Sequence, residues 1–190
     1  MLDVALIWNN ATGSADFEMV NGDLVTDPGL QTALILSLFA DRLAAPGDVL
    51  PDNSTDRRGF WGDLPVDPAA QISGPSAADL TGSRLWLLDR ALQTQQTLRL
   101  AESYAEEALA WMVSDGVVGG VSAQASFPGE GLLELQITLT QAGASSTYAF
   151  AFALTPNLPA PVSAAAESLY LGTESGASLT NEAGALLVLD

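Results

Sequence analysis

Positive charge is scarce in this 190-residue chain and is gathered in two short segments. The chain has six basic residues, all arginines, against 23 aspartates and glutamates. Five of the arginines lie within residues 41–63 and 82–90, interleaved with carboxylates, glycines and two of the four tryptophans. An arginine can bind a carboxylate through two parallel hydrogen bonds. The pattern therefore predicts either a rigid polar core or a surface used in assembly.

Composition narrows the range of partners and of chemistry. The net charge is −17 and lysine is absent, whereas nucleic acids and anionic membranes are bound by clustered Lys and Arg. We therefore expect no nucleic acid and no membrane as partners. Cysteine and histidine are also absent, which excludes disulfides, thiol chemistry and histidine-based catalysis and removes the usual zinc ligands. We expect no catalytic residue, no metal and no cofactor, and we see no signal peptide.

Short strands are expected at the beginning of the chain, before a first helix. The strand-like pieces are Asp3–Trp8, Phe17–Val20 and Leu24–Val25. Asn21-Gly22 is typical of a tight hairpin turn. Asp27 and Pro28 favour a helix start, because Asp is a good N-cap and Pro fits the first helical position. We expect this helix to end near Leu43, with an apolar face formed by Leu30, Leu34, Ile35 and Leu38.

Residues 46–80 are rich in proline, glycine and aspartate and predict a long loop. Leaving Phe60 and Trp61 in water would be costly. We therefore expect Thr55–Leu64 to pack against the domain.

Two further helices are predicted after this loop, a short one from Ser83 to about Leu92 and a longer one from about Thr94 to Asp115. Gly116 suits the C-terminal cap of the longer helix. Its apolar residues recur at spacings of three and four, which is typical of one buried helix face: Leu98, Ala101, Tyr104, Ala105, Ala108, Leu109 and Met112.

Three strand-like runs follow and predict an antiparallel meander: Val117–Phe127, Leu132–Thr140 and Thr147–Thr155. In the second run, leucine and isoleucine alternate with polar residues, so one face is expected to be buried. The fold class expected is α+β, an antiparallel sheet or meander packed against two or three helices.

The chain changes character after Thr155. Three prolines interrupt residues 156–161. An imperfect repeat follows, Thr173–Ala177 and Asn181–Ala185, and it precedes the apolar segment Leu186–Leu189. We interpret residues 1–155 as one domain and residues 156–190 as a linker followed by a β-forming arm that needs a partner.

Several long segments of the sequence resemble the Mu-type baseplate protein family of contractile-tailed phages. They are TDRRGFWGD (Thr55–Asp63), GSRLWLLDR (Gly82–Arg90), DVALIW (Asp3–Trp8), NGDLVTDPGLQTALILSLFADR (Asn21–Arg42) and AESYAEEALAWMVSDGVV (Ala101–Val118). The resemblance covers roughly residues 1–153. The family it points to is related to the small wedge protein of T-even phages, which carries an old lysozyme label.

The resemblance implies a structural part of the baseplate wedge that initiates the contractile sheath. The partners it implies are the tail sheath protein, other wedge subunits and tube or hub proteins, with six copies per baseplate. The place it implies is the virion tail baseplate, after assembly in the host cytoplasm. It implies strand exchange with sheath subunits near the last strand of the meander.

The candidate interface residues follow from these arguments: Arg57, Arg58, Trp61, Asp63, Arg84, Arg90, Tyr148, Phe150, Phe152, Leu186, Leu187, Val188 and Leu189. For the arginines the alternative is an internal role that ties the long loop to its own domain. For the strand carrying Tyr148 the alternative is an ordinary sheet edge blunted by the chain itself.

Two other function classes stay open at this point. A tail-associated peptidoglycan hydrolase would need two carboxyl groups flanking a sugar, and Glu102, Glu106 and Glu107 are the obvious candidates. Their spacing places Glu102 and Glu106 opposite the apolar stripe, so we expect a solvated face there. The third class is an acidic scaffold that helps assembly and then leaves the particle.

Overall fold

The computed structural model describes residues 3–27, 29–51, 55–63, 80–141 and 144–154. In chain order its elements are β1 (Asp3–Val4), β2 (Leu6–Asn9), β3 (Ser14–Phe17), β4 (Met19–Val20), β5 (Asp23–Leu24), β6 (Thr26–Asp27), α1 (Gln31–Phe39), the 3₁₀-helix η1 (Trp61–Asp63), the 3₁₀-helix η4 (Leu85–Leu88), α2 (Gln95–Ser114), β7 (Gly120–Ser126), β8 (Leu132–Gln141) and β9 (Ala144–Ala153). The C-terminal arm, with Leu186–Leu189, lies outside the described residues.

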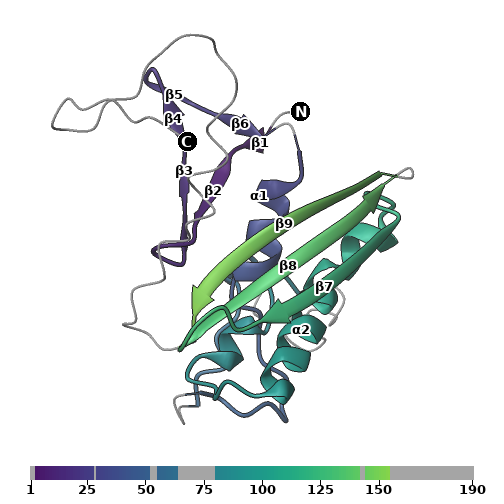
Figure 1. The fold of residues 1–190 in the computed structure, drawn as a ribbon. Coiled ribbons are helices and arrows are strands. Elements are labelled where there is room, and N and C mark those ends of the chain that lie inside the picture. The colour runs from purple at the N-terminus through teal and green to yellow at the C-terminus, as the bar shows by residue number, and fades with distance from the viewer. Residues whose placement is uncertain (1–2, 28, 52–54, 64–79, 142–143, 155–190) are drawn as a thin grey trace, which may run out of the picture.

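An antiparallel three-stranded meander, in the order β7-β8-β9, forms one layer of the domain. Helices α1 and α2 cover one face of this sheet (Figure 1). The largest fully buried side chains come from both layers: Leu34, Leu38, Leu109, Met112, Leu133, Leu135, Ile137 and Leu154. The α+β fold predicted from the sequence is confirmed.

Strand β8 shows why the meander forms. Its alternating residues Leu133, Leu135, Ile137 and Leu139 are all buried, whereas the residues between them are half-buried or exposed. Period-two alternation places one set of side chains on each face of a strand. The predicted meander is therefore confirmed, although β9 begins at Ala144, three residues earlier than expected.

Helix α2 is bounded by local signals that the sequence contains. The Thr94 side chain caps the N-terminus by accepting a hydrogen bond from Thr97 N. At the other end Gly116 adopts a φ of 71°, its N–H bonds to Val113 O, and Val117 N bonds to Met112 O. This pair of bonds is a Schellman motif, which needs a left-handed residue such as glycine. The predicted helix and cap are confirmed.

Helix α1 differs from the prediction at both ends. It begins at Gln31, with Leu30 as its N-cap residue, and ends at Phe39, not near Leu43. Asp27 still serves the helix start from outside, because its carboxylate accepts hydrogen bonds from Gly29 N at 2.7 Å and Thr32 N at 2.8 Å. Burial tends to raise the pKa of Asp27, but these backbone hydrogen bonds outweigh it and lower the pKa below its ordinary value.

The predicted helix from Ser83 to about Leu92 is also wrong in extent. The structure has only the 3₁₀-turn η4, which ends at Asp89 in an extended conformation with a ψ of 123°. Tertiary pairing on both sides explains this: Ser83 N bonds to Ala40 O, and Arg90 N bonds to Leu154 O. The segment uses its terminal backbone groups in contacts with other elements, so the helix cannot extend.

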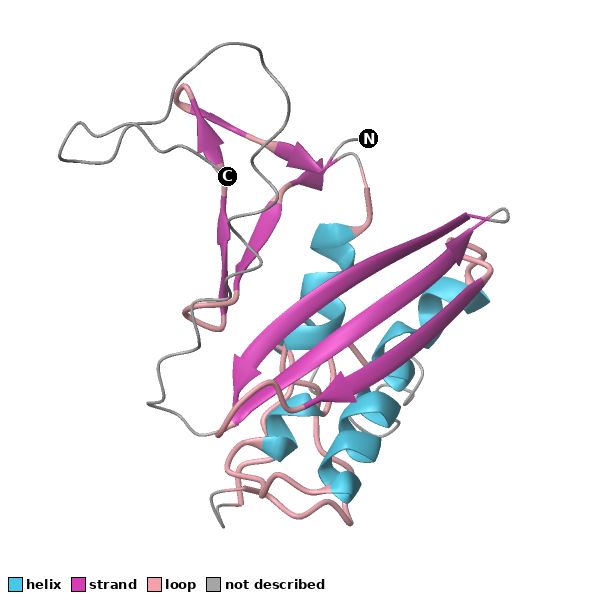
Figure 2. Ribbon diagram, in the orientation of Figure 1, coloured by secondary structure: helices cyan, strands magenta, loops and turns pink. Residues whose placement is uncertain are grey.

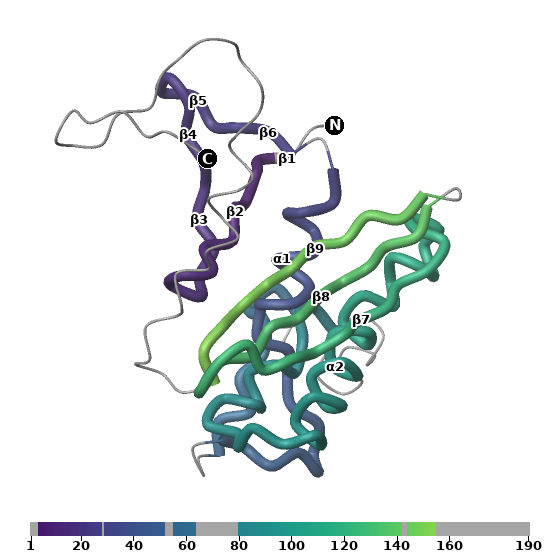
Figure 3. The backbone as a smooth tube through the Cα atoms, viewed as in Figure 1, coloured from purple at the N-terminus to yellow at the C-terminus, as the bar shows by residue number. Residues whose placement is uncertain are grey.

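Residues 3–27 form a separate β-rich arm, which we call the N-terminal arm. Three short antiparallel pairs, β1-β6, β2-β3 and β4-β5, make it up. They meet where Ala5 N bonds to Val25 O and Val25 N bonds to Glu18 O. Figures 2 and 3 show the arm projecting away from the meander, with the β4-β5 hairpin far from the helices.

One stacked aromatic pair ties the arm to the domain. Trp8 of β2 lies 3.7 Å from Phe39 of α1, centroid to centroid, at an interplanar angle of 15°. Phe150 meets both rings edge-on. Within the described part of the chain, no helix has the length and apolar character needed to cross a membrane.

Gly82 provides a test of the packing between α1 and η4. Its φ is +91°, and an added Cβ would lie 2.2 Å from Ala40 O. We expect Gly82→Ala to lower the free energy of unfolding by about 3 kcal/mol or more, since steric overlap adds to the left-handed backbone cost. Gly116→Ala is the control: its φ is +71°, but a Cβ there meets nothing within 4 Å. It should cost only about 1–2 kcal/mol.

Denaturant unfolding measures the loss of stability in both variants, and equal losses would contradict the proposed overlap between Gly82 and Ala40.

Candidate functional site

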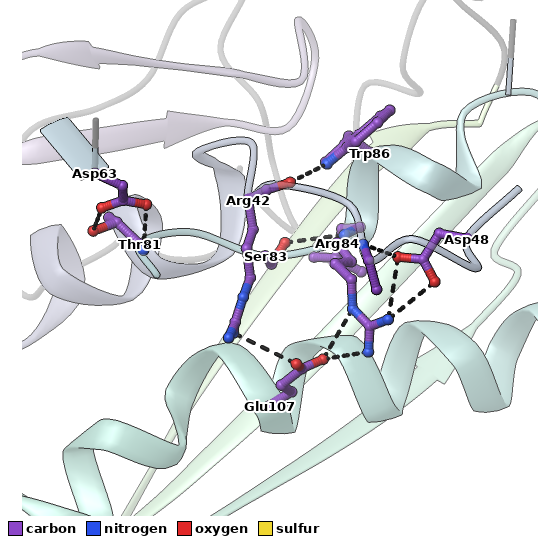
Figure 4. Close-up of polar contacts among 10 residues, drawn as sticks. Arg42, Asp48, Asp63, Thr81, Ser83, Arg84, Trp86 and Glu107 are labelled. Carbon is purple, nitrogen blue, oxygen red and sulfur yellow. Dashed lines mark hydrogen bonds and ion pairs between the residues drawn. The ribbon is translucent and has the colours of Figure 1, made fainter. Parts of the chain in front are cut away.

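The two arginine-rich segments cross each other beside helix α1. Arg42 N bonds to Ser83 O at 3.0 Å, and Ser83 N bonds to Ala40 O at 2.9 Å. The Ser83 hydroxyl donates to Leu38 O, and the Trp86 indole donates to Arg42 O at 2.9 Å (Figure 4). This crossing leaves the last carbonyls of α1 satisfied by a distant part of the sequence.

Arg84 projects from the crossing into a cluster of carboxylates. Its guanidinium lies 2.6 Å from Glu107 Oε2 and 3.2 Å from Asp48 Oδ1, and stacks 4.6 Å from the Tyr104 ring centre. Glu107 also faces Arg42 at 3.6 Å (Figure 4). Burial tends to lower the pKa of Arg84, but the hydrogen bonds and charges of Glu107 and Asp48 outweigh it and raise the pKa.

Arg57 and Arg58 both contact their own domain. The Arg57 guanidinium donates to Ala44 O, and Ala44 N bonds to Arg57 O at 3.0 Å. Arg58 lies 2.9 Å from Asp41 and stacks 4.4 Å above the Trp86 ring. These contacts favour the internal alternative, in which the arginines tie the long loop to the domain.

Three other candidate residues, Asp63, Trp61 and Arg90, differ in burial and in hydrogen bonding. Asp63 accepts hydrogen bonds from the backbone and hydroxyl of Thr81, both at 2.8 Å. Trp61 is 78% exposed, so the expectation that this segment buries its aromatic residues is wrong for Trp61. The segment is held by polar contacts, and the exposed indole lies beside the Phe60 ring, 5.4 Å away between ring centroids. Arg90 is exposed, and its φ of 68° belongs to the turn that ends η4.

Strand β9 buries its aromatic rings in its own core. Phe150 is 3% exposed, and Tyr148 and Phe152 are partly buried against the same cluster. Phe39 of α1 contacts Phe150 and Phe152 edge-on. A partner approaching this strand would therefore meet its backbone edge, not these rings.

The N-terminal arm covers the β9 edge at one outward residue, Ala151. The Trp8 indole donates to Ala151 O at 3.1 Å, and Ala151 N donates to Asn10 Oδ1 at 2.8 Å. Because backbone groups alternate in direction along an antiparallel strand, Ser145, Thr147 and Ala149 also direct theirs away from β8. These three residues are exposed, and their outward groups have no hydrogen-bond partner in the part of the chain that the structure describes.

The opposite edge of the sheet is covered by helix α2. Glu102 accepts a hydrogen bond from Ala125 N at 3.0 Å, and Glu106 accepts one from Ala123 N at 3.3 Å. The expectation of a purely solvated glutamate face is thus wrong, because two of these carboxylates cap the donors of β7. Among the described residues, no group of acidic side chains is arranged to hold a metal ion.

Sequence reasoning missed Trp8, Asn10 and Asp48 as contributors to the site, and it considered Glu107 only as a hydrolase candidate and not as the partner of the arginines. All four act on residues at least 23 positions away, so no local pattern identifies them. Of these residues, only Asp48 had a local signal in the sequence, because it is a polar residue that follows the Pro46-Gly47 turn near the arginine-rich segment.

The geometry defines the class of protein. Its arginines stabilise its own loops, its acidic pair caps its own strand, and its sheet presents one open backbone edge. The class is a small α+β domain whose sheet leaves part of the β9 edge without a partner among the described residues.

Comparison with known proteins gives the family. The pattern of the family described as phage protein GP46 matches residues 30–146. The chain is 43% identical over 140 residues to the baseplate protein gp46 of Escherichia phage Mu, covering 74% of this chain and 88% of that protein. It is 38% identical over 137 residues to the Mu-like prophage FluMu protein gp46 of Haemophilus influenzae, covering 72% and 85%. The chain belongs to this family of phage baseplate proteins, and the predicted family is confirmed.

The Arg84 cluster predicts a stability difference. Arg84→Ala would leave Asp48 and Glu107 without their shared cation, and we expect a loss of about 2 kcal/mol in the free energy of unfolding. Arg99→Ala, on an exposed position of α2, should change it by less than about 0.5 kcal/mol. Chemical denaturation distinguishes the two variants. Equal stability of both would mean that the Arg84 contacts contribute nothing.

The acidic pair on α2 predicts a second difference. Replacing Glu102 and Glu106 with alanine should remove two acceptors from β7 and cost about 1–3 kcal/mol. The double glutamine variant keeps an acceptor at each position and should stay near wild type. Thermal melting measures both, and a cell-wall digestion assay run in parallel should find no lytic activity to lose. Lysis by the wild type that the glutamine variant lacks would instead support the hydrolase alternative.

Proposed function

We propose that this protein is a non-enzymatic part of the baseplate wedge that links the baseplate to the first sheath ring and starts sheath assembly. In this proposal it is made in the host cytoplasm, joins other wedge subunits and the tail sheath protein, and is present in six copies per baseplate. The observation that supports the proposal most is the open part of the β9 edge.

The open edge suits an added strand. Ser145, Thr147 and Ala149 offer alternating N–H and C=O groups over five residues, enough for a short strand from another chain to pair with β9. The edge is not blocked by inward charges or prolines, which proteins commonly use to prevent such pairing. A sheath subunit that adds a strand here would continue the meander.

The covered parts of the sheet support the same proposal. Glu102 and Glu106 occupy donors on the β7 side, and Trp8 and Asn10 occupy Ala151 on the β9 side. Pairing is thereby directed to residues 145–149. A single permitted docking position would give each added subunit the same register, which an assembly initiator needs.

The experiment removes one outward donor without disturbing the sheet. Ala149→Pro deletes an N–H that points away from β8, and proline is tolerated at such edge positions. We expect melting close to wild type and sheath nucleation reduced by about tenfold, or ~1.4 kcal/mol. The control Ala149→Thr keeps the donor and should nucleate normally. Polymerisation of the purified sheath protein of the same phage on purified wedges is the measurement. Normal nucleation by a folded Ala149→Pro variant would overturn strand addition.

A further inference from the structure

The far end of the N-terminal arm exposes large apolar side chains that its own domain does not cover. Phe17, Met19, Val20 and Leu24 each have half or more of their surface exposed. Met19 pairs with Leu24 across the β4-β5 hairpin, so these two side chains lie on one face. A lone two-stranded hairpin is marginal in water. Burial of this face in a partner would stabilise it.

Three carboxylates, Asp16, Glu18 and Asp23, adjoin these apolar residues in the chain. Residues 3–27 contain five acidic side chains and no arginine: Asp3, Asp16, Glu18, Asp23 and Asp27. Asp23 pairs with Val20 on the other face of the hairpin from Met19 and Leu24, and Asp16 pairs with Ile7 in the neighbouring β2-β3 pair. The surface is thus apolar with an acidic border, which is complementary to an apolar groove bordered by cations.

A second copy of this chain is a poor match for that surface. Its net charge is −17, and Arg42, Arg57, Arg58 and Arg84 already contact oxygens of their own domain. Among the described residues Arg57, Arg90 and Arg99 form no ion pair, and the Arg57 guanidinium already donates to Ala44 O, which leaves Arg90 and Arg99. Two such cations cannot balance five carboxylates on the facing arm.

We propose that the β4-β5 hairpin and Phe17 dock into an apolar groove, bordered by Lys or Arg, on a different protein of the baseplate. The contact is separate from the β9 edge and does not require the sheath. The Trp8–Phe39 stack and the Ala151 hydrogen bonds hold the base of the arm against the domain. The docked hairpin would therefore fix the orientation of the meander as well as its attachment.

Methionine oxidation tests the proposal in the intact particle. Met19 is 63% exposed and Met112 is 0% exposed in the chain by itself. Dilute hydrogen peroxide should oxidise Met19 readily in the free protein and about tenfold more slowly in purified tails. Met112 is the internal control and should resist oxidation in both. Equal oxidation of Met19 in the two samples would overturn the proposal, and absence of the chain from tails would overturn the baseplate role as well.

A photocrosslinker identifies the occupant. Benzoylphenylalanine in place of Phe17 should crosslink, in assembled tails, to a peptide of another baseplate protein that has Lys or Arg beside apolar residues. Crosslinks to a second copy of this chain, to sheath protein or to an acidic peptide would each contradict the proposal.

Two variants separate the contribution of charge from that of apolar contacts to the attachment of the chain in tails. Neutralising Asp16, Glu18 and Asp23 together (Asp→Asn, Glu→Gln) should make the chain dissociate from tails more readily and with weaker dependence on salt. Met19→Ser with Leu24→Ser should weaken attachment at every salt concentration. Wild-type thermal melting verifies that both variants are still folded. Wild-type retention of both folded variants would contradict docking by this hairpin.

Discussion

The crossing of residues 40–44 with residues 82–86 is the contact on which the rest of the domain depends. The backbone of Ser83 bonds in both directions across it, and Gly82 passes so close to Ala40 that no side chain fits. This contact ends α1, limits η4 to one turn and aims Arg84 at the carboxylates of the neighbouring elements. The long loop between the two segments is therefore fixed at both of its ends.

The contacts of the six arginines explain why the surface of the protein is acidic. Four of the six arginines contact oxygens of their own domain, two of them stacked on aromatic rings. Arginine suits this role because its planar group can bind several acceptors and stack at once. The remaining surface is strongly acidic, which favours partners with exposed positive charge and disfavours association of the chain with itself.

The sheet shows how a small domain can direct its contacts. Burial raises the pKa of Asp89, in the turn that follows η4, and the nearby charge of Arg58, at 3.6 Å, partly offsets this. Side chains from α2 and from the N-terminal arm bind outward backbone groups at three edge positions: Ala123, Ala125 and Ala151. The outward backbone groups of residues 145–149 remain without a partner in the described part of the chain, and uncovered groups of this kind are where another strand can pair.

The sequence by itself determined the elements whose signals are local. Thr94 and Gly116 mark the ends of α2, the alternation along β8 marks its buried face, and Asn21-Gly22 marks a hairpin. Only the tertiary structure decided where α1 ends, how short η4 is, and whether each arginine faces its own domain. Those outcomes rest on hydrogen bonds between residues 13 to 64 positions apart, such as Arg57 with Ala44, Ser83 with Ala40 and Arg90 with Leu154. A local sequence pattern contains no information about such distant partners, because the partner is specified by the packing of the whole domain.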